Sequence, residues 1–349
     1  MAGPLNTFRV ALERFLLAWL VLLCGLAYAW PDWFGNQAPD PFAASKGSLP
    51  YLIMVTMFAI GSLLPLDEIR QVARRWPMVL AGTGVQYLAM PLLGWSMGKL
   101  FGLEGAWLVG IVVVGCVPGA MASNVLTLMA RGNTSYSVSL TTSATLLSPL
   151  AVPLVMGLAL GREVPNFPAG RVCWELLWMV VIPVVSGHAL ARGWAAWRSA
   201  AGMVGPIAAN LTILWIIAVV VAVNRGQVAS LDARLLGALA AVNVLGYLAG
   251  YAGGWAIRLD SPMRRALTIE VGMQNAGLGT TLALSLFPDL PAAALPAALY
   301  TFGCMFTGII LARAWATWGR AMPATPASAP DPAAQVEPEG ELQSHEQRP

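Results

Sequence analysis

Two polar, glycine-rich segments interrupt a sequence that is otherwise rich in Leu, Val, Ala and Ile. The first is GCVPGAMASNVLTLMARGN at residues 115–133, and the second is TIEVGMQNAGLGTT at residues 268–281. The second contains Glu270, and a lone carboxylate costs at least a few kcal/mol near the centre of a bilayer. Such a group is tolerated when it is protonated, paired with a basic residue or neutralised by a bound cation. We therefore expect these two segments to form the functional site.

Both segments contain residues that favour a break in a helix. Pro118 and Gly119 lie in the first segment, and Gly272 and Gly277 flank the polar residues of the second. Unwound backbone is tolerated at membrane depth only where protein or a water-filled cavity surrounds it. A broken helix offers carbonyl oxygens to a cation and positive half-helix N-termini to an anionic group. The two segments thus predict a site that can hold ions of both signs.

The residue types near Glu270 favour Na⁺ among the metal cations. The nearest basic residues in sequence, Arg264 and Arg265, are expected in a loop, and no basic residue falls in the middle of an apolar span. The available ligands are one carboxylate, Gln and Asn amides, Ser and Thr hydroxyls and free carbonyls. Zn²⁺ would favour Cys or His, and Mg²⁺ generally keeps several waters. A low-charge, oxygen-rich set therefore indicates an alkali cation.

The composition requires that these segments sit in a polytopic membrane protein. Of 349 residues, 57% are hydrophobic and 11% charged, with a mean hydropathy of +0.67. A soluble domain has about 25% charged residues. Apolar spans of a length that can cross a bilayer are expected at residues 14–30, 49–64, 77–98, 104–129, 134–159, 172–191, 204–224, 233–257, 263–286 and 290–318.

The basic residues predict the orientation of these ten spans. If the N-terminus is cytoplasmic, 14 of the 20 Lys and Arg residues lie inside and 6 outside, so both termini are expected inside. Residues 35–48 are expected to form the longest external loop. The Pro- and Ala-rich residues 321–349 lack apolar periodicity and are expected to be a disordered cytoplasmic tail.

The two polar segments hold matching places in the chain. They lie about 150 residues apart, each in the fourth of a set of five spans. Two five-helix repeats of this kind insert with opposite topology, because five is odd. We expect residues 1–160 to form the first repeat and residues 161–320 the inverted second repeat.

The polar segments resemble those of the bile acid:sodium symporter family. The resemblance rests on VPGAMASNVLTLMARGNTSYSVSLTTSATLLSPLAVPLVM at 117–156 and IEVGMQNAGL at 269–278, and it extends over residues 10–318. It implies an all-α fold of ten transmembrane helices in two inverted five-helix repeats. Spans 3–5 and 8–10 would form a core domain, spans 1, 2, 6 and 7 a panel domain, and spans 4 and 9 would be broken and would cross. Ala120 departs from the second glycine that the family commonly has after Pro118.

The resemblance also implies the ligands of two Na⁺ ions. One ion would be bound by Ser123, Asn124, Ser137, Thr141 and Glu270. The other would be bound by Gln86, Glu270, Val271, Met273 and Gln274, with Val271 and Met273 contributing backbone carbonyls. Asn275 resembles a residue that faces the substrate cavity, and Pro118 and Gly119 at the first break are expected to contact substrate.

The expected function is Na⁺-coupled uptake of an organic anion by alternating access, in the bacterial inner membrane. The anion would be bile acid-like, pantoate-like or a keto acid. Two alternatives remain open: a proton-coupled or uncoupled carrier in which Glu270 titrates, and efflux of a small anion, for which Cys116 is the thiol nearest a break. The chain lacks an HExxH motif and has no pair of carboxylates within its apolar spans, so an enzyme is not expected. No nucleic acid or obligate protein partner is indicated.

Overall fold

The chain folds into helices, as its composition predicted. A computed structural model describes residues 4–35 and 38–321, and this part of the chain contains no β-strand. Eight helical segments in it are long and apolar enough to cross a membrane, which confirms the polytopic membrane class. These segments are Leu16–Phe34, Pro41–Leu63, Trp76–Leu100, Thr134–Leu160, Ala169–Gly193, Ala195–Val223, Ala233–Ala256 and Pro291–Thr317.

The two remaining expected spans are pairs of shorter helices. The first pair is α7 (Gly105–Cys116) and α8 (Ala122–Met129), and the second is α15 (Ser261–Gly272) and α16 (Ala276–Leu286). Each break coincides with a polar segment, as the proline and glycines predicted. The inverted relation between residues 1–160 and 161–320 stays a prediction.

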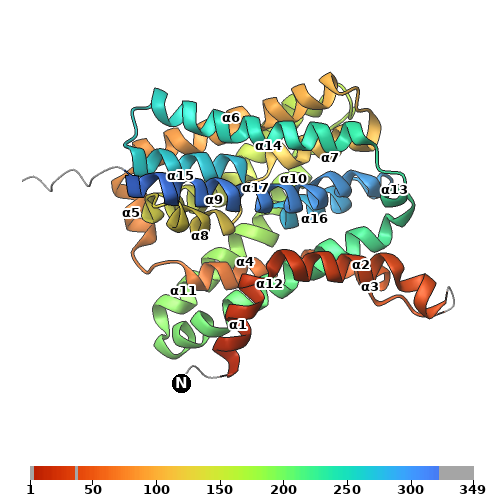
Figure 1. Cartoon of the computed structure of the whole chain (residues 1–349), viewed down its shortest axis with the longest axis horizontal. Helices are drawn as coiled ribbons and strands as arrows, with labels where there is room; N and C mark the ends of the chain where they lie inside the picture. Colours follow the sequence, from red (N-terminus) through yellow and green to blue (C-terminus); the bar gives the residue numbers. More distant parts are fainter. Residues whose placement is uncertain (1–3, 36–37, 322–349) are drawn as a thin grey trace, which may run out of the picture.

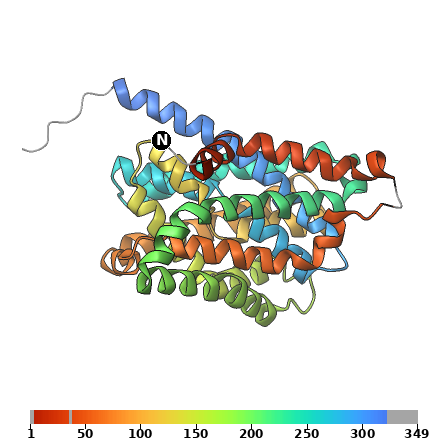
Figure 2. The same ribbon diagram turned by 90° about the horizontal axis from the view of Figure 1, so that it is seen from below.

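Four helices form one layer, here called the panel group. They are α2 (Leu16–Phe34), α4 (Leu49–Leu63), α11 (Ile182–Gly193) and α12 (Ala195–Val223). Packing contacts join α2 to α12, α12 to α4 and α4 to α11, and Figure 2 shows them side by side in this order. The short helix α1 (Pro4–Arg14) packs on α12.

The other layer, here called the core group, surrounds the four half-helices. Its long helices are α6 (Trp76–Leu100), α9 (Thr134–Leu160), α14 (Ala233–Ala256) and α17 (Leu295–Ala321). Helix α6 packs on α7, α9 and α14, and α14 packs on α15 and α17. Figure 1 shows this group above the panel group.

One span connects the two groups. Its first part, α10 (Ala169–Leu176), packs on α9 of the core group, and its last part, α11, packs on α4 of the panel group. A π-helical turn, η2 (Leu177–Val181), joins them. The remaining short elements are α5 (Glu68–Arg74), α13 (Arg225–Ala229) and the 3₁₀ turn η3 (Pro291–Ala294).

The prediction of a loop over residues 35–48 is wrong for its second half, which is helical. Residues 41–48 form α3 (Pro41–Ala44) and the 3₁₀ turn η1 (Ser45–Ser48), which continue into α4. Asp40 caps α3, because its Oδ1 accepts from the N–H groups of Phe42 (2.9 Å) and Ala43 (3.1 Å). Aspartate at the N-cap followed by proline is a helix-start signal, and it lengthens the second span here. The expected tail beyond Ala321 lies outside the described residues.

Candidate functional site

The two helix breaks cross and pair with each other. Gly119 and Gln274 form an isolated antiparallel bridge. The N–H of Asn275 donates to the carbonyl of Pro118 at 2.8 Å, and the N–H of Ala120 donates to the carbonyl of Met273 at 2.9 Å. Val117 and Met273, which follow α7 and α15, both have extended backbone. Each unwound segment thereby satisfies backbone groups of the other, which buried backbone requires.

The crossing brings the first break against the acid of the second. A Cβ atom added at Gly119 would collide with the Glu270 carboxylate. Gly119 is therefore needed for close approach, and the backbone of one half of the chain covers the charged group of the other.

Three elements surround the Glu270 carboxylate. Its side chain lies on α15 and is 0% exposed. Oε2 accepts from Ser123 Oγ of α8 at 2.5 Å, and Oε1 accepts from Thr141 Oγ1 of α9 at 2.7 Å. No Lys, Arg or His of the described residues pairs with it within 4.0 Å. The carboxylate is thus held by neutral hydroxyls, which leaves its negative charge without a protein counter-ion.

Two amide oxygens near the breaks have no donor. Asn124 Oδ1 and Gln274 Oε1 are buried and without a hydrogen-bond partner. Their amide nitrogens are used, because Asn124 Nδ2 donates to Met121 Sδ at 3.5 Å and Gln274 Nε2 donates to the Val271 carbonyl at 2.8 Å. A buried acceptor without a partner costs about 1–3 kcal/mol. Oxygens left free in this way suit a cation, which needs acceptors and no donors.

The structure brings only some of the predicted Na⁺ ligands into contact with Glu270. Ser123 and Thr141 contact Glu270 directly, whereas Ser137 Oγ accepts from Thr127 Oγ1 at 3.2 Å. Gln86 Nε2 is buried without a hydrogen-bond partner, and no hydrogen bond among the described residues joins Gln86 to Glu270. The carbonyls of Val271 and Met273 each already accept one hydrogen bond. The assignment of all these residues to Na⁺ stays a prediction.

Helix N-termini meet at the same crossing. Helices α8 and α16 begin at Ala122 and Ala276, directly after the two breaks. Asn275 Oδ1 caps α16 by accepting from the Leu278 N–H at 3.1 Å. Pro118 and Gly119 are buried, whereas Asn275 is partly exposed. Of the three predicted substrate residues, Asn275 is thus the one whose side chain can be reached from outside the protein.

A polar network supports the second break and was not predicted from the sequence. The carbonyl of Gly272, at the end of α15, accepts from Asn243 Nδ2 and Tyr300 Oη, each at 2.9 Å. Asn243 Oδ1 in turn accepts from Thr307 Oγ1 at 2.6 Å, and Tyr247 Oη lies 3.2 Å from Thr307 Oγ1. These residues belong to α14 and α17 and fix the helix end next to Glu270. The sequence feature from which this network could have been inferred is Asn243, the one asparagine within the apolar span 233–257.

Comparison with known proteins agrees with this geometry. Residues 50–231 match the sequence profile of the Sodium Bile acid symporter family. The uncharacterized sodium-dependent transporter YocS of Bacillus subtilis is 31% identical over 281 residues, 80% of this chain and 87% of that protein.

Two plant relatives extend the comparison. The probable sodium/metabolite cotransporter BASS1 of Arabidopsis thaliana chloroplasts is 28% identical over 297 residues, 85% of this chain and 72% of that protein. Its counterpart in Oryza sativa is 29% identical over 297 residues, 85% of this chain and 71% of that protein. The profile match and the breadth of these alignments confirm the resemblance inferred from the two polar segments: the chain belongs to the sodium bile acid symporter family.

Proposed function

We propose that the protein is a sodium-coupled symporter that carries a small organic anion into the cell by alternating access. The observation that carries this proposal is the buried carboxylate of Glu270, which has two hydroxyl partners and no basic partner in the described residues. A cation at this carboxylate neutralises a charge that is otherwise costly inside a membrane protein. The names of the relatives, sodium-dependent transporter and sodium/metabolite cotransporter, support Na⁺ as that cation.

Coupling follows from the shared position of the ion and the substrate groups. Glu270, Gln274 and Asn275 lie within six residues across one break, so an ion bound before the break also orders the residues after it. Substrate is bound at the N-termini of α8 and α16 once the crossing is ordered. By linkage, Na⁺ and the anion each raise the affinity of the other. Movement of the core group against the panel group then exposes the site to the other side of the membrane.

Proton coupling is the second candidate, because the same carboxylate can be neutralised by a proton. The partners of Glu270 are hydroxyls, and Thr141 Oγ1 can donate to the Ser137 carbonyl at 3.1 Å and accept from a protonated Glu270, so the two hydroxyls are compatible with either a proton or a metal cation. The free oxygens of Asn124 and Gln274 favour a metal cation at the crossing. Efflux of a small anion through a thiol is not favoured, because Cys116 is completely buried.

Uptake in proteoliposomes tests the proposal. Labelled taurocholate, pantoate and pyruvate represent the bile acid, pantoate and keto acid classes. We expect uptake of at least one to require an inward Na⁺ gradient and to fall to background when choline replaces Na⁺. Uptake that follows an imposed pH gradient without Na⁺ supports the proton carrier instead. Uptake that is equal in Na⁺ and in choline without a pH gradient contradicts coupling altogether.

The orientation proposed for the membrane is that both termini are cytoplasmic. It is supported by the excess of 14 basic residues over 6 on the side that holds the termini. In a bacterial cell the protein would then reside in the inner membrane. The segment 41–48 and the C-terminal end of α16 would face outward in this orientation.

A further inference from the structure

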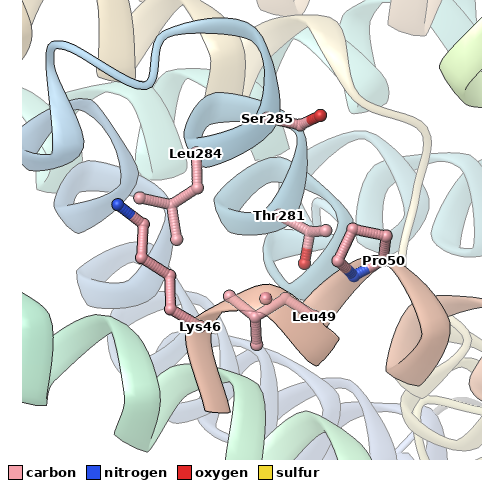
Figure 3. Close-up of a pocket in the computed structure, with 7 residues that line it drawn as sticks. Lys46, Leu49, Pro50, Thr281, Leu284 and Ser285 are labelled. Atoms are coloured by element: carbon pink, nitrogen blue, oxygen red, sulfur yellow. The ribbon is translucent and has the colours of Figure 1, made fainter. Parts of the chain in front are cut away.

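A cavity of about 280 Å³ lies between the panel group and the core group, away from the crossing. One wall is the start of the second span and the other is the last turns of α16, as Figure 3 shows. Its lining residues are Lys46, Gly47, Leu49, Pro50, Thr281, Leu284 and Ser285. Gly47 is exposed and Leu49 is buried, so the cavity leads from the protein surface into the interface between the two groups.

A free hydroxyl lies at the buried end of this cavity. Thr281 is 1% exposed, and its Oγ1 has no hydrogen-bond partner. The neighbouring Thr280 is also buried, but its hydroxyl donates to the Gly277 carbonyl at 2.8 Å, the usual arrangement for threonine in a helix. An unpaired buried hydroxyl costs about 1–3 kcal/mol. Thr281 therefore has a donor available for a bound molecule.

The cavity also carries positive charge that the protein does not neutralise. Lys46 is partly buried, and no carboxylate of the described residues lies within 4.0 Å of its ammonium group. The nearby acid Glu175 accepts from Ser285 Oγ at 2.7 Å and pairs with Arg171 at 3.4 Å. Arg171 also donates to the Ser285 carbonyl at 2.8 Å. The charges of Glu175 and Arg171 neutralise each other, whereas the positive charge of Lys46 has no such partner. This positive charge favours an anionic ligand.

The rest of the lining is apolar, which favours an organic anion over an inorganic one. Leu49, Pro50 and Leu284 supply the walls, and the Lys46 side chain extends past Leu284 in Figure 3. Small inorganic anions gain nothing from apolar walls, whereas an organic anion buries its hydrocarbon part against them. The lining is thus suited to a carboxylate or sulfonate group attached to an apolar body.

Two isoleucines lie beside α16 between its cavity-lining end and the crossing. Thr281 lies six residues along α16 from Asn275, roughly 9 Å of helix. Gly277 lies between them, and Ile53 of α4 and Ile213 of α12 approach to 3.8 and 3.7 Å from where its Cβ would be. Both isoleucines belong to the panel group. Movement of the panel group against α16 would therefore open or close the passage from the cavity to the crossing.

We propose that this cavity is an outer binding site for the transported organic anion, where Lys46 pairs with its acidic group and Thr281 donates a hydrogen bond to it. The anion is held here before Ile53 and Ile213 separate from Gly277 and admit it to the crossing. This inference rests on the proposed function for the identity of the ligand. The charge and access of the cavity are properties of the chain alone, which allows a test without a known substrate.

Thiol labelling tests the cavity directly. Ser285→Cys, at a partly exposed lining position, is made in a Cys173→Ser background, because Cys173 is partly exposed whereas Cys24, Cys116 and Cys304 are buried. The full-length protein is treated with methanethiosulfonates of similar size, one carrying a sulfonate and one a trimethylammonium group. We expect the sulfonate reagent to react faster at position 285. We also expect Lys46→Gln to lower the ratio of the two rates by about tenfold, since one unit charge within several Å acts oppositely on the two reagents.

Lys99→Gln is the matched control for this experiment. Lys99 and Lys46 are the two lysines of the chain, and Lys99 is ion-paired with Glu163 away from the cavity lining. Its substitution should leave the ratio of rates within about twofold. Gly47→Cys repeats the measurement at an exposed lining position if Ser285→Cys does not fold. Equal sensitivity to the two lysine substitutions, or no reaction at either cysteine, overturns the proposal.

Uptake measurements distinguish failure of the outer site from failure of the proposed sodium coupling. With whichever of taurocholate, pantoate or pyruvate shows Na⁺-dependent uptake, Lys46→Gln should raise the half-saturating anion concentration about tenfold. The half-saturating Na⁺ concentration, measured at saturating anion, should stay unchanged. An unchanged half-saturating anion concentration contradicts the outer site and leaves sodium coupling intact. Loss of Na⁺ dependence in the unsubstituted protein contradicts the proposed function, while the labelling ratio still reports whether the cavity selects anions.

Discussion

The two helix breaks differ in what they contribute to the crossing. The break between α7 and α8 covers residues 117–121 and contains a proline and a glycine that approaches the acid closely. The break between α15 and α16 covers only residues 273–275 and begins three residues after Glu270. The first half of the chain thus provides hydroxyls and close backbone, and the second provides the charge. Neither half supplies both, so the proposed cation site depends on the crossing being formed.

The two breaks also differ in how they are held. At the second break, side chains of α14 and α17 donate two hydrogen bonds to the Gly272 carbonyl. At the first, no side chain of the described residues donates to the last-turn carbonyls of α7, at residues 113–116. The end of α15 next to the second break is therefore held by side chains of α14 and α17. The first break is instead held by its backbone hydrogen bonds to the second. The comparison predicts that changes at the second break act mainly on ion affinity.

The largest effect is expected when the charge is removed from the second break. Glu270→Gln should lower Na⁺ affinity at least about 100-fold, because loss of a buried charged partner costs about 3–5 kcal/mol. The measurement is the rise in apparent Tm with NaCl, with choline chloride as the ionic-strength control. Glu68→Gln is the matched variant, since Glu68 is also buried and accepts from Ser139 Oγ at 2.8 Å. An equal loss of the Na⁺ response in both variants contradicts a specific role for Glu270.

A smaller effect is expected from filling the close approach at the first break. Gly119→Ala places a methyl group against the Glu270 carboxylate, and overpacking of this kind costs about 1–3 kcal/mol. We expect a lower apparent Tm and a weaker Na⁺ response. Gly277→Ala is the control, because its added methyl meets neighbours at 3.7 Å or more, an ordinary contact. If the two alanine variants behave alike, the contact between the first break and Glu270 does not restrict the site.

The smallest effect is expected in the network behind the second break. Tyr300→Phe removes one of the two donors to the Gly272 carbonyl, worth about 1 kcal/mol, and should lower Na⁺ affinity about fivefold. The remaining donor, Asn243, keeps the helix end in place. Tyr251→Phe, at an exposed position on α14, should leave Na⁺ affinity unchanged. A lower apparent Tm with unchanged Na⁺ affinity assigns Tyr300 to stability alone.

The sequence determined the class of protein, the positions of both breaks and the acidic residue that the structure buries beside them. Apolar spans in a chain with few charges require a membrane, and proline and glycine mark where a helix cannot continue. Glu270 stands out because an acid in such a span is rare. The extension of the second span by α3 and η1 followed from Asp40 and Pro41, a local signal that the loop assignment overlooked.

The tertiary structure alone decided which groups meet. Ser123 and Thr141 reach Glu270 from 147 and 129 residues away, and no local pattern specifies such a distance. Ser137 and Thr141 both carry a hydroxyl and share one helix face, yet Ser137 Oγ accepts from Thr127 Oγ1 and only Thr141 reaches Glu270. The hydrogen bonds from Asn243 and Tyr300 to Gly272, and the cavity between Lys46 and Thr281, likewise depend on how separate helices pack. Helix propensity and hydropathy act along the chain, whereas these contacts are set by the packing of one helix against another.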